Sequence, residues 1–278
     1  MAFDPNQLLS QPPIETRQHI TPKKVMLYAL GVGAHELPFV YEDGLQALPG
    51  MAVIMAYPGF IWRDPQYGID WTKILHGETS ITCHAPLPVS GELIGKTSFG
   101  PIFDKGAAKG AVVYQTREIH HEDGTHVATV RNATFLRGDG GFGGTSEGQP
   151  APHAIPDRPA DLVHTLTTAE NQALIYRLSG DMNPLHVDPE VAKAAGFPRP
   201  ILHGLCTFGV AGRSLLAALA DNDTARITRI DARFSAPVFP GETISTEIWH
   251  EGDGTAAFRS KVVERDLIVL NNGYVEFQ

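Results

Sequence analysis

Two short turns rich in proline and glycine, each followed by a run of alternating residues, constrain the fold of this 278-residue chain most strongly. Residues 85–92 read APLPVSGE, and residues 236–242 read APVFPGE. In the runs that follow, 93–98 and 244–248, the side chains alternate as is typical of a strand with one buried face. The same turn and strand occur twice, which indicates an internal repeat.

A pair of strands follows each of these runs. Residues 111–136 contain two stretches of strand-forming residues separated by a Glu-Asp-Gly turn, and residues 255–277 contain a second such pair. These strands follow one another closely along the chain, which favours antiparallel pairing.

One apolar helix is expected before the strands of each half. In the second half, apolar and small residues recur at three- and four-residue steps: Leu205, Phe208, Gly209, Gly212, Leu215, Leu216 and Leu219. Glycines at 204, 209 and 212 are expected to let this helix lie close against a sheet. In the first half, the expected counterpart is residues 49–57, PGMAVIMAY, where Pro49 suits a first-turn position. A buried helix followed by antiparallel strands, present twice, predicts an α+β architecture.

The stretch 138–160 is dominated by Gly and Pro and keeps no hydrophobic period, so it is interpreted as a linker. It separates residues 1–137 from residues 161–278, and each of these parts is long enough to form a small domain.

Composition and charge exclude several classes of partner. The net charge is −9 with no run of Lys or Arg, which argues against binding to nucleic acid or an anionic membrane. The longest apolar run, residues 51–57, is too short to span a bilayer, and no signal peptide is recognised at the N-terminus. Cys83 and Cys206 lie in apolar surroundings and are expected to be buried free thiols, which suits a reducing compartment. A cytoplasmic location without a membrane partner is therefore expected.

The stretch 176–188, YRLSGDMNPLHVD, carries an acid, an amide and an imidazole within six residues. As a plain turn, Asp181 could form an Asx-type hydrogen bond, Asn183 could cap a helix and Pro184 could start it. As a site, Asp181 on the loop and His186 on the first helical turn could converge on one water and exchange protons with it. In this second interpretation Asn183 could orient one of the pair through a side-chain hydrogen bond.

A second segment, residues 198–209 (PRPILHGLCTFG), places His203 and Gly204 at the start of the apolar helix. The first N–H groups of a helix are unpaired and lie at the positive end of its dipole. The Gly204 N–H could therefore stabilise a developing oxyanion. Close packing between helix and sheet explains the same glycine equally well.

Two other kinds of site are less favoured by the spacing. Asp181, His186 and His203 are metal-ligand types, but neither cysteine completes a zinc spacing and no H-x-x-x-H or C-x-x-C occurs. A Ser-His-Asp hydrolase would be expected to carry a G-x-S-x-G elbow, and none occurs.

These motifs resemble those of the MaoC-like R-specific 2-enoyl-CoA hydratases, in particular the hydratase 2 unit of peroxisomal multifunctional enzyme type 2. The resemblance also extends, in order, over YALGVGA at 28–34, LHGE at 75–78, DKG at 104–106, FLRGDGGFGG at 135–144, ADND at 220–223 and ARFSAPVFPGET at 232–243. It covers nearly the whole chain.

The resemblance implies a double hot-dog fold, in which each of two units has a long helix wrapped by an antiparallel sheet. It implies a non-catalytic N-terminal unit that accommodates the acyl chain and a catalytic C-terminal unit. The activity implied is reversible hydration of a trans-2-enoyl-CoA to an (R)-3-hydroxyacyl-CoA, without metal or organic cofactor, in a homodimer. Two alternatives remain open at this point: an acyl-CoA thioesterase of hot-dog fold, and a non-catalytic acyl-CoA-binding protein.

The resemblance also implies roles for individual residues. Asp181 and His186 would be the acid/base pair, Asn183 the positioning amide, and the Gly204 N–H the donor to the thioester oxygen. The implied substrate-contacting positions are His76, Gly77, Lys105, Phe234, Met182, Pro184 and Leu185. The sequence AAKG after DKG lengthens that loop slightly, so Lys105 and Lys109 could exchange roles at the CoA phosphates.

Overall fold

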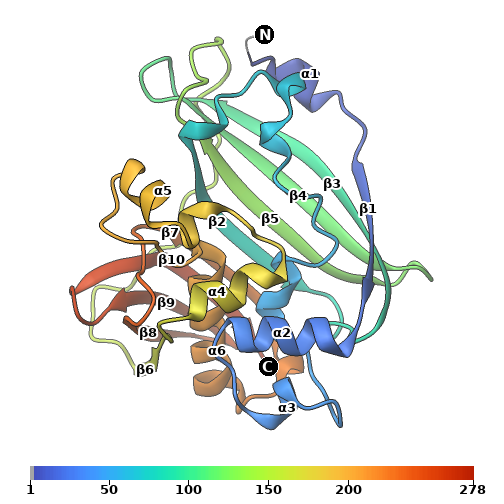
Figure 1. Cartoon of the computed structure of the whole chain (residues 1–278), viewed down its shortest axis with the longest axis vertical. Coiled ribbons are helices and arrows are strands. Elements are labelled where there is room, and N and C mark those ends of the chain that lie inside the picture. The colour runs from blue at the N-terminus through green and yellow to red at the C-terminus, as the bar shows by residue number, and fades with distance from the viewer. Residues whose placement is uncertain (1–2) are drawn as a thin grey trace.

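Ten strands form one continuous antiparallel sheet in the computed structural model, which describes residues 3–278 (Figure 1). Their order across the sheet is β1-β3-β4-β5-β2-β7-β10-β9-β8-β6. The strands are β1 (Ile14–Ile20), β2 (Ile74–Cys83), β3 (Gly91–Asp104), β4 (Ala111–His121), β5 (His126–Leu136), β6 (Leu162–Thr167), β7 (Ile227–Phe234), β8 (Thr243–Gly252), β9 (Thr255–Val262) and β10 (Leu267–Phe277).

The sheet consists of two halves with the same connectivity. In the first half the strands lie in the order β1, β3, β4, β5, β2. In the second half the equivalent order is β6, β8, β9, β10, β7. Strands β2 and β7 join the halves, with buried Ile81 opposite buried Ile230. The predicted internal repeat, alternating strands and hairpins are thus present.

Helix α6 (Gly204–Ala220) is the main helix of the fold, and it contacts β6, β7, β8 and β10. It is apolar almost all round and buried along most of its length, as the spacing predicted. A Cβ atom on Gly209 would lie 2.5 Å from Val32 Cγ1 and 2.8 Å from the Tyr28 hydroxyl, whereas one on Gly212 would meet Ile230 at an ordinary 3.6 Å. Gly209 therefore lets α6 approach the N-terminal half of the chain, rather than the sheet as predicted.

The prediction of a helix over residues 49–57 is wrong in type. The segment forms a single 3-10 turn, η1 (Pro49–Val53), and is then held by distant groups. Arg117 on β4 donates to the carbonyl oxygens of Ala52 and Val53, and Ala56 adopts a left-handed backbone with φ of 45°. Because these partners come from another part of the chain, the local pattern did not reveal where the helix stops.

The longer α-helix of the first half, α2 (Pro22–Gly31), was not predicted. Thr21 caps it through its side chain and Pro22 occupies its first position, so a start signal was present in the sequence. Figure 1 shows α2 beside α4 (Gln172–Tyr176), and Gln172 donates to the carbonyl oxygen of Gly31 at 2.5 Å.

The remaining helical segments are short: α1 (Pro5–Leu9), α3 (Leu37–Val40), η2 (Ile61–Arg63), η3 (Pro65–Tyr67), η4 (Trp71–Lys73), η5 (Arg177–Ser179), η6 (Pro184–His186), α5 (Pro189–Ala194) and η7 (Thr224–Arg226). Between Leu136 and Leu162 the chain forms no helix or strand. Asp104 holds part of this Gly-rich stretch by accepting hydrogen bonds from the N–H groups of Gly141, Gly143 and Gly144.

Both cysteines are free, with Cys206 buried and Cys83 half-buried. Among the described residues, 3–278, no helix is both long enough and apolar enough to cross a bilayer.

Candidate active site

The turn at 179–186 is built by its own side chains. Gly180 takes a φ of 128°, which side-chain-bearing residues rarely adopt, and the chain then reverses into η6. The Asp181 carboxylate accepts a hydrogen bond from the Asn183 N–H at 3.1 Å, and Asn183 Oδ1 accepts one from the Leu185 N–H at 3.1 Å. Asn183 therefore caps the turn that carries His186, with Pro184 in its first position. This cap is the role that the plain-turn interpretation expected of Asn183, whose Oδ1 bonds to the backbone rather than to the acid or the imidazole.

The protonation pattern of His186 follows from its contacts. Its Nδ1 lies 2.8 Å from the carbonyl oxygen of Ile201, and because a carbonyl only accepts, Nδ1 carries the proton. Nε2 is then the basic nitrogen. The side chain is buried at 8% exposure, and burial lowers its pKa from the usual value. A neutral imidazole with a free Nε2 is the form that a general base requires.

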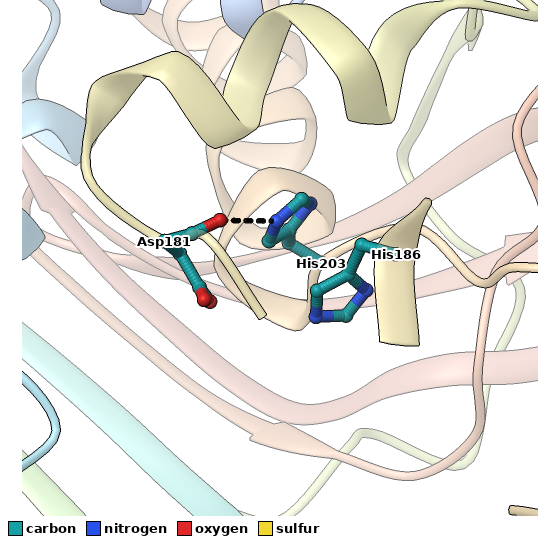
Figure 2. Close-up of side chains that lie close together, drawn as sticks. All are labelled: Asp181, His186 and His203. Atoms are coloured by element: carbon teal, nitrogen blue, oxygen red, sulfur yellow. Dashed lines mark hydrogen bonds between the residues drawn. The ribbon is translucent and has the colours of Figure 1, made fainter. Parts of the chain in front are cut away.

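Three side chains from two segments meet at this point (Figure 2). The ligand-type atoms of Asp181, His186 and His203 all lie within 4.8 Å of one another. Asp181 is exposed, whereas both imidazoles are buried. The sequence predicted the convergence of Asp181 and His186, but it identified His203 only as a possible metal ligand.

The orientation of His203 bears on the metal alternative. Its Nε2 lies 3.1 Å from the backbone carbonyl oxygen of Asp181, so this nitrogen, which faces Asp181 in Figure 2, donates a hydrogen bond. The His203 nitrogen that faces Asp181 is thus occupied by a proton, which leaves the Asp181 carboxylate and one nitrogen of His186 as the free ligand atoms on this side of the cluster, while His203 Nδ1 lies on the other side of its ring. Catalytic zinc sites use three protein ligands, so the arrangement fits an acid/base pair better than a metal centre.

Helix α6 begins at Gly204, immediately after His203. A Cβ atom on Gly204 would lie 3.3 Å from the ring of Phe234, tighter than an ordinary contact. The unpaired N–H groups of this first turn form the positive end of the helix dipole, beside Asp181 and His186. The geometry thus accommodates both explanations of this glycine, donation to a substrate and close packing.

A pocket of about 940 Å³ opens beside Gly204, within the size range of ligand sites. Its lining includes six of the residues singled out from sequence: His76, Gly77, Lys105, Lys109, Gly204 and Phe234. Several other lining residues are apolar, among them Leu75, Val112, Phe135, Phe197 and Val238. Two further cations, Arg137 and Arg233, and the acid Glu78 also line it. Met182, Pro184 and Leu185 are not part of this lining, and neither are Asp181 and His186. The pocket reaches the start of α6 at Gly204, the residue that follows His203 in the chain.

His76 forms a fixed part of the pocket wall. Its Nε2 lies 2.8 Å from Thr79 Oγ1 and 3.2 Å from Asn132 Oδ1, and its ring packs on Phe234 with centroids 4.8 Å apart. Desolvation by the pocket wall lowers the pKa of His76 and favours the neutral ring, although part of the residue stays exposed.

Two repeats of an antiparallel sheet, with helix α6 packed on the second, define a double hot-dog fold, and a carboxylate and a neutral imidazole lie close together beside the start of that helix. The chain matches the family model of the MaoC like domain over residues 152–272 and that of the MFE-2 hydratase 2 N-terminal domain over residues 19–138. It belongs to the MaoC-like hydratase 2 family.

Curated relatives support this membership along the whole chain. The chain is 45% identical over 291 aligned residues to 3-hydroxyacyl-thioester dehydratase Y of Mycobacterium tuberculosis, covering 100% of this chain and 99% of that protein. It is 43% identical over 265 residues to peroxisomal multifunctional enzyme type 2 of Mus musculus, covering 90% of this chain but only 35% of that longer protein.

Solved structures agree on the fold. The crystal structure of a MaoC-like dehydratase from Phytophthora capsici superposes with a TM-score of 0.91 at 37% identity, covering 99% of both chains. A Mycobacterium tuberculosis protein described as having a double hotdog fold superposes with a TM-score of 0.60 at 14% identity, covering 96% of both chains, which supports the fold alone. The predicted double hot-dog fold is confirmed, with the difference that the first half has a single 3-10 turn where a long helix was expected.

Proposed function

We propose that this chain catalyses the reversible hydration of trans-2-enoyl-CoA to (R)-3-hydroxyacyl-CoA in fatty-acid metabolism. One observation supports this function above all: the Nδ1–H of His186 is bonded to Ile201, which leaves Nε2 as a free base in a cluster with the Asp181 carboxylate. Two relatives, at 45% and 39% identity, are named 3-hydroxyacyl-thioester dehydratase and enoyl-CoA hydratase 2. Both names denote the same class of reaction.

In the proposed mechanism, Asp181 and His186 hold one water molecule between them. The pair accepts one proton from this water as its oxygen bonds to C3 of the enoyl thioester. The pair then returns a proton to C2 on the same face, so that one water is added and the site regains its initial protonation state. Such acid/base steps contribute about 10²–10⁴-fold each.

As the C3–O bond forms, negative charge develops on the thioester oxygen. The Gly204 N–H, at the positive end of α6, is the proposed donor to this oxygen. Loss of one such donor typically costs about 10²–10³-fold in rate. No step of this scheme needs a metal ion or an organic cofactor.

The pocket beside Gly204 suits a CoA thioester. Lys105 and Lys109 line it together with apolar side chains, so that phosphates and an acyl-pantetheine arm both find complementary groups. In this proposal His76, Gly77 and Phe234 form the wall near the thioester, and Met182, Pro184 and Leu185 contact substrate from the catalytic turn.

The remaining proposals concern the chain as a whole. Residues 161–278 would form the catalytic unit, residues 1–137 a non-catalytic unit that accommodates the acyl chain, and residues 138–160 the linker. We further propose a homodimer in the cytoplasm, where the free thiols of Cys83 and Cys206 would persist.

The test follows the loss of enoyl-thioester ultraviolet absorbance with crotonyl-CoA and a long-chain trans-2-enoyl-CoA. Chiral chromatography of the product and a parallel thiol-release assay accompany it. An (R)-3-hydroxyacyl-CoA is expected, whereas released CoA would identify a thioesterase and binding without turnover would identify a binding protein.

Two variants test the pair itself. Asp181→Asn and His186→Asn should each lower kcat by at least about 10²-fold. The asparagine at 186 can place its amide near the Nδ1 position and keep the bond to Ile201, so the fold should be retained. Near-wild-type turnover in either variant would overturn the proposed pair.

A further inference from the structure

His203 is a buried polar residue, and its position just before helix α6 does not explain why an imidazole is found there. It precedes the first residue of α6, the position where a side chain often caps the helix, yet its side chain makes no capping bond. It is 1% exposed, and its Nδ1 has no hydrogen-bond partner among the described residues. A buried imidazole with an unpaired nitrogen costs stability compared with an apolar side chain, so packing alone does not account for it.

The other imidazole nitrogen does have a partner, and the partner lies in the proposed site. Nε2 of His203 donates to the backbone carbonyl oxygen of Asp181 at 3.1 Å. This bond joins the first turn of α6 to the loop that carries the carboxylate, across 22 residues of sequence (Figure 2). It fixes the backbone from which the Asp181 side chain projects.

The ring of His203 also fixes the second member of the pair. It stacks on the ring of His186 with centroids 3.7 Å apart and an interplanar angle of 28°. The ring of His203 also packs against the ring of Tyr176, with centroids 4.9 Å apart and an interplanar angle of 52°. One rigid, buried ring therefore contacts both Asp181 and His186 and adjoins Gly204.

His203 is held in its neutral form. The pKa of His203 is lowered to about 4, mainly because the ring is buried and further because His186 lies beside it. At neutral pH it therefore leaves proton uptake to His186, and its Nε2–H remains available to Asp181.

We infer that His203 is a positioning residue, which holds Asp181 through its Nε2–H and His186 through its ring so that both address the same water. This inference rests on the proposed hydratase function, since it concerns the geometry of that pair. Misplacement of a reacting group by about 1 Å can cost about 10²-fold in rate, which is the scale of effect expected here.

The experiment compares His203→Gln with His203→Asn in the full-length protein. A glutamine places an amide N–H near the position of Nε2 and can keep the bond to Asp181. An asparagine places it near Nδ1, where no partner exists, and so serves as the matched control. We expect the Asn variant to lose about 10- to 100-fold in kcat and the Gln variant to recover the part of that loss that depends on the bond to Asp181. KM and melting temperature should be similar in the two variants.

A second readout does not depend on turnover. Imidazole ¹⁵N NMR of the wild type should show His203 as the Nε2–H tautomer, uncharged down to about pH 5. Equal kcat in the Gln and Asn variants, or an Nδ1–H tautomer, would overturn the positioning role. A wild type that hydrates no enoyl-CoA would instead overturn the proposed function, so the two failures are distinguishable.

Discussion

The Nδ1–H of His186 donates to the carbonyl oxygen of Ile201 at 2.8 Å, which joins the end of η6 to the segment that leads into α6. This single bond sets the tautomer of the imidazole, because the carbonyl accepts and cannot donate. It also places Nε2, the basic nitrogen, toward the carboxylate of Asp181. The chemistry of the pair thus depends on a backbone group 15 residues away in sequence.

Gly204→Ala separates the two explanations of that glycine. The added Cβ would lie 3.3 Å from the Phe234 ring, so the ring must move slightly, and it would also crowd the N–H that is proposed to bind the thioester oxygen. We expect kcat/KM to fall by about 10²-fold with little change in melting temperature. The control is the double variant Gly204→Ala with Phe234→Leu. If relief of the ring contact restored activity, close packing rather than oxyanion binding would be the role of Gly204.

Two other glycines of α6 form a matched pair for stability. Gly209→Ala would place a Cβ 2.5 Å from Val32 and 2.8 Å from the Tyr28 hydroxyl, so it should lower the free energy of unfolding by about 1–3 kcal/mol. Gly212→Ala meets Ile230 at 3.6 Å and gains helix propensity, so it should be neutral or stabilising by up to about 1 kcal/mol. Urea unfolding followed by circular dichroism measures both. A Gly212 variant as unstable as the Gly209 variant would contradict this account.

Lys105→Ala and Lys109→Ala test which cation meets the CoA phosphates. Lys105 donates to the carbonyl oxygen of Ser146 at 3.1 Å and is thereby held at the pocket, so the larger effect is expected from its loss. We expect KM for crotonyl-CoA to rise about 3- to 10-fold, which is the scale of losing one partly exposed charge pair. The rise in KM should be smaller at high salt, because salt screens this interaction. Crotonyl-pantetheine, which lacks the nucleotide phosphates, is the control. An equal rise in KM for both substrates would exclude a role in phosphate binding.

The stability of the protein should fall as the pH drops below neutrality, in part because of His203. Its pKa is lowered from the ordinary 6.5 to about 4, so the unfolded chain binds this proton more readily than the folded one. The stabilisation is complete above about pH 7 and is lost as the pH falls toward 4, by up to about 3 kcal/mol. The charged or titratable groups that face it are His186, Asp181 and Arg177.

His203→Phe removes this titration while keeping an aromatic ring between Tyr176 and His186. The free energy of unfolding, measured in urea at pH 7.5, 6 and 5, should decline less steeply in this variant than in the wild type. Parallel curves would show that the acid sensitivity arises elsewhere, for example at His186 or His76, whose pKa values burial also lowers.

Local sequence determined β3, β4, β5, β8, β9, β10, their turns and helix α6, whereas β1, β2, β6 and β7 were not predicted. Alternation predicted β3 and β8, the Glu-Asp-Gly turn predicted the β4–β5 hairpin, and three- and four-residue spacing predicted α6, because each pattern reflects contacts with one buried face. The turn at 179–186 was also predictable, since Asp181 and Asn183 bond to backbone groups only two residues away.

Tertiary structure alone decided the features that depend on partners from distant segments. Residues 49–57 stop after one 3-10 turn, where Arg117 from β4 binds the carbonyls of Ala52 and Val53. The tautomer of His186 depends on Ile201, and the role of His203 depends on the Asp181 carbonyl, which no spacing in the chain indicates. The physical reason is that a short-range pattern records which face of an element is buried, whereas the hydrogen-bond partner of a buried polar group is chosen only when remote segments pack together.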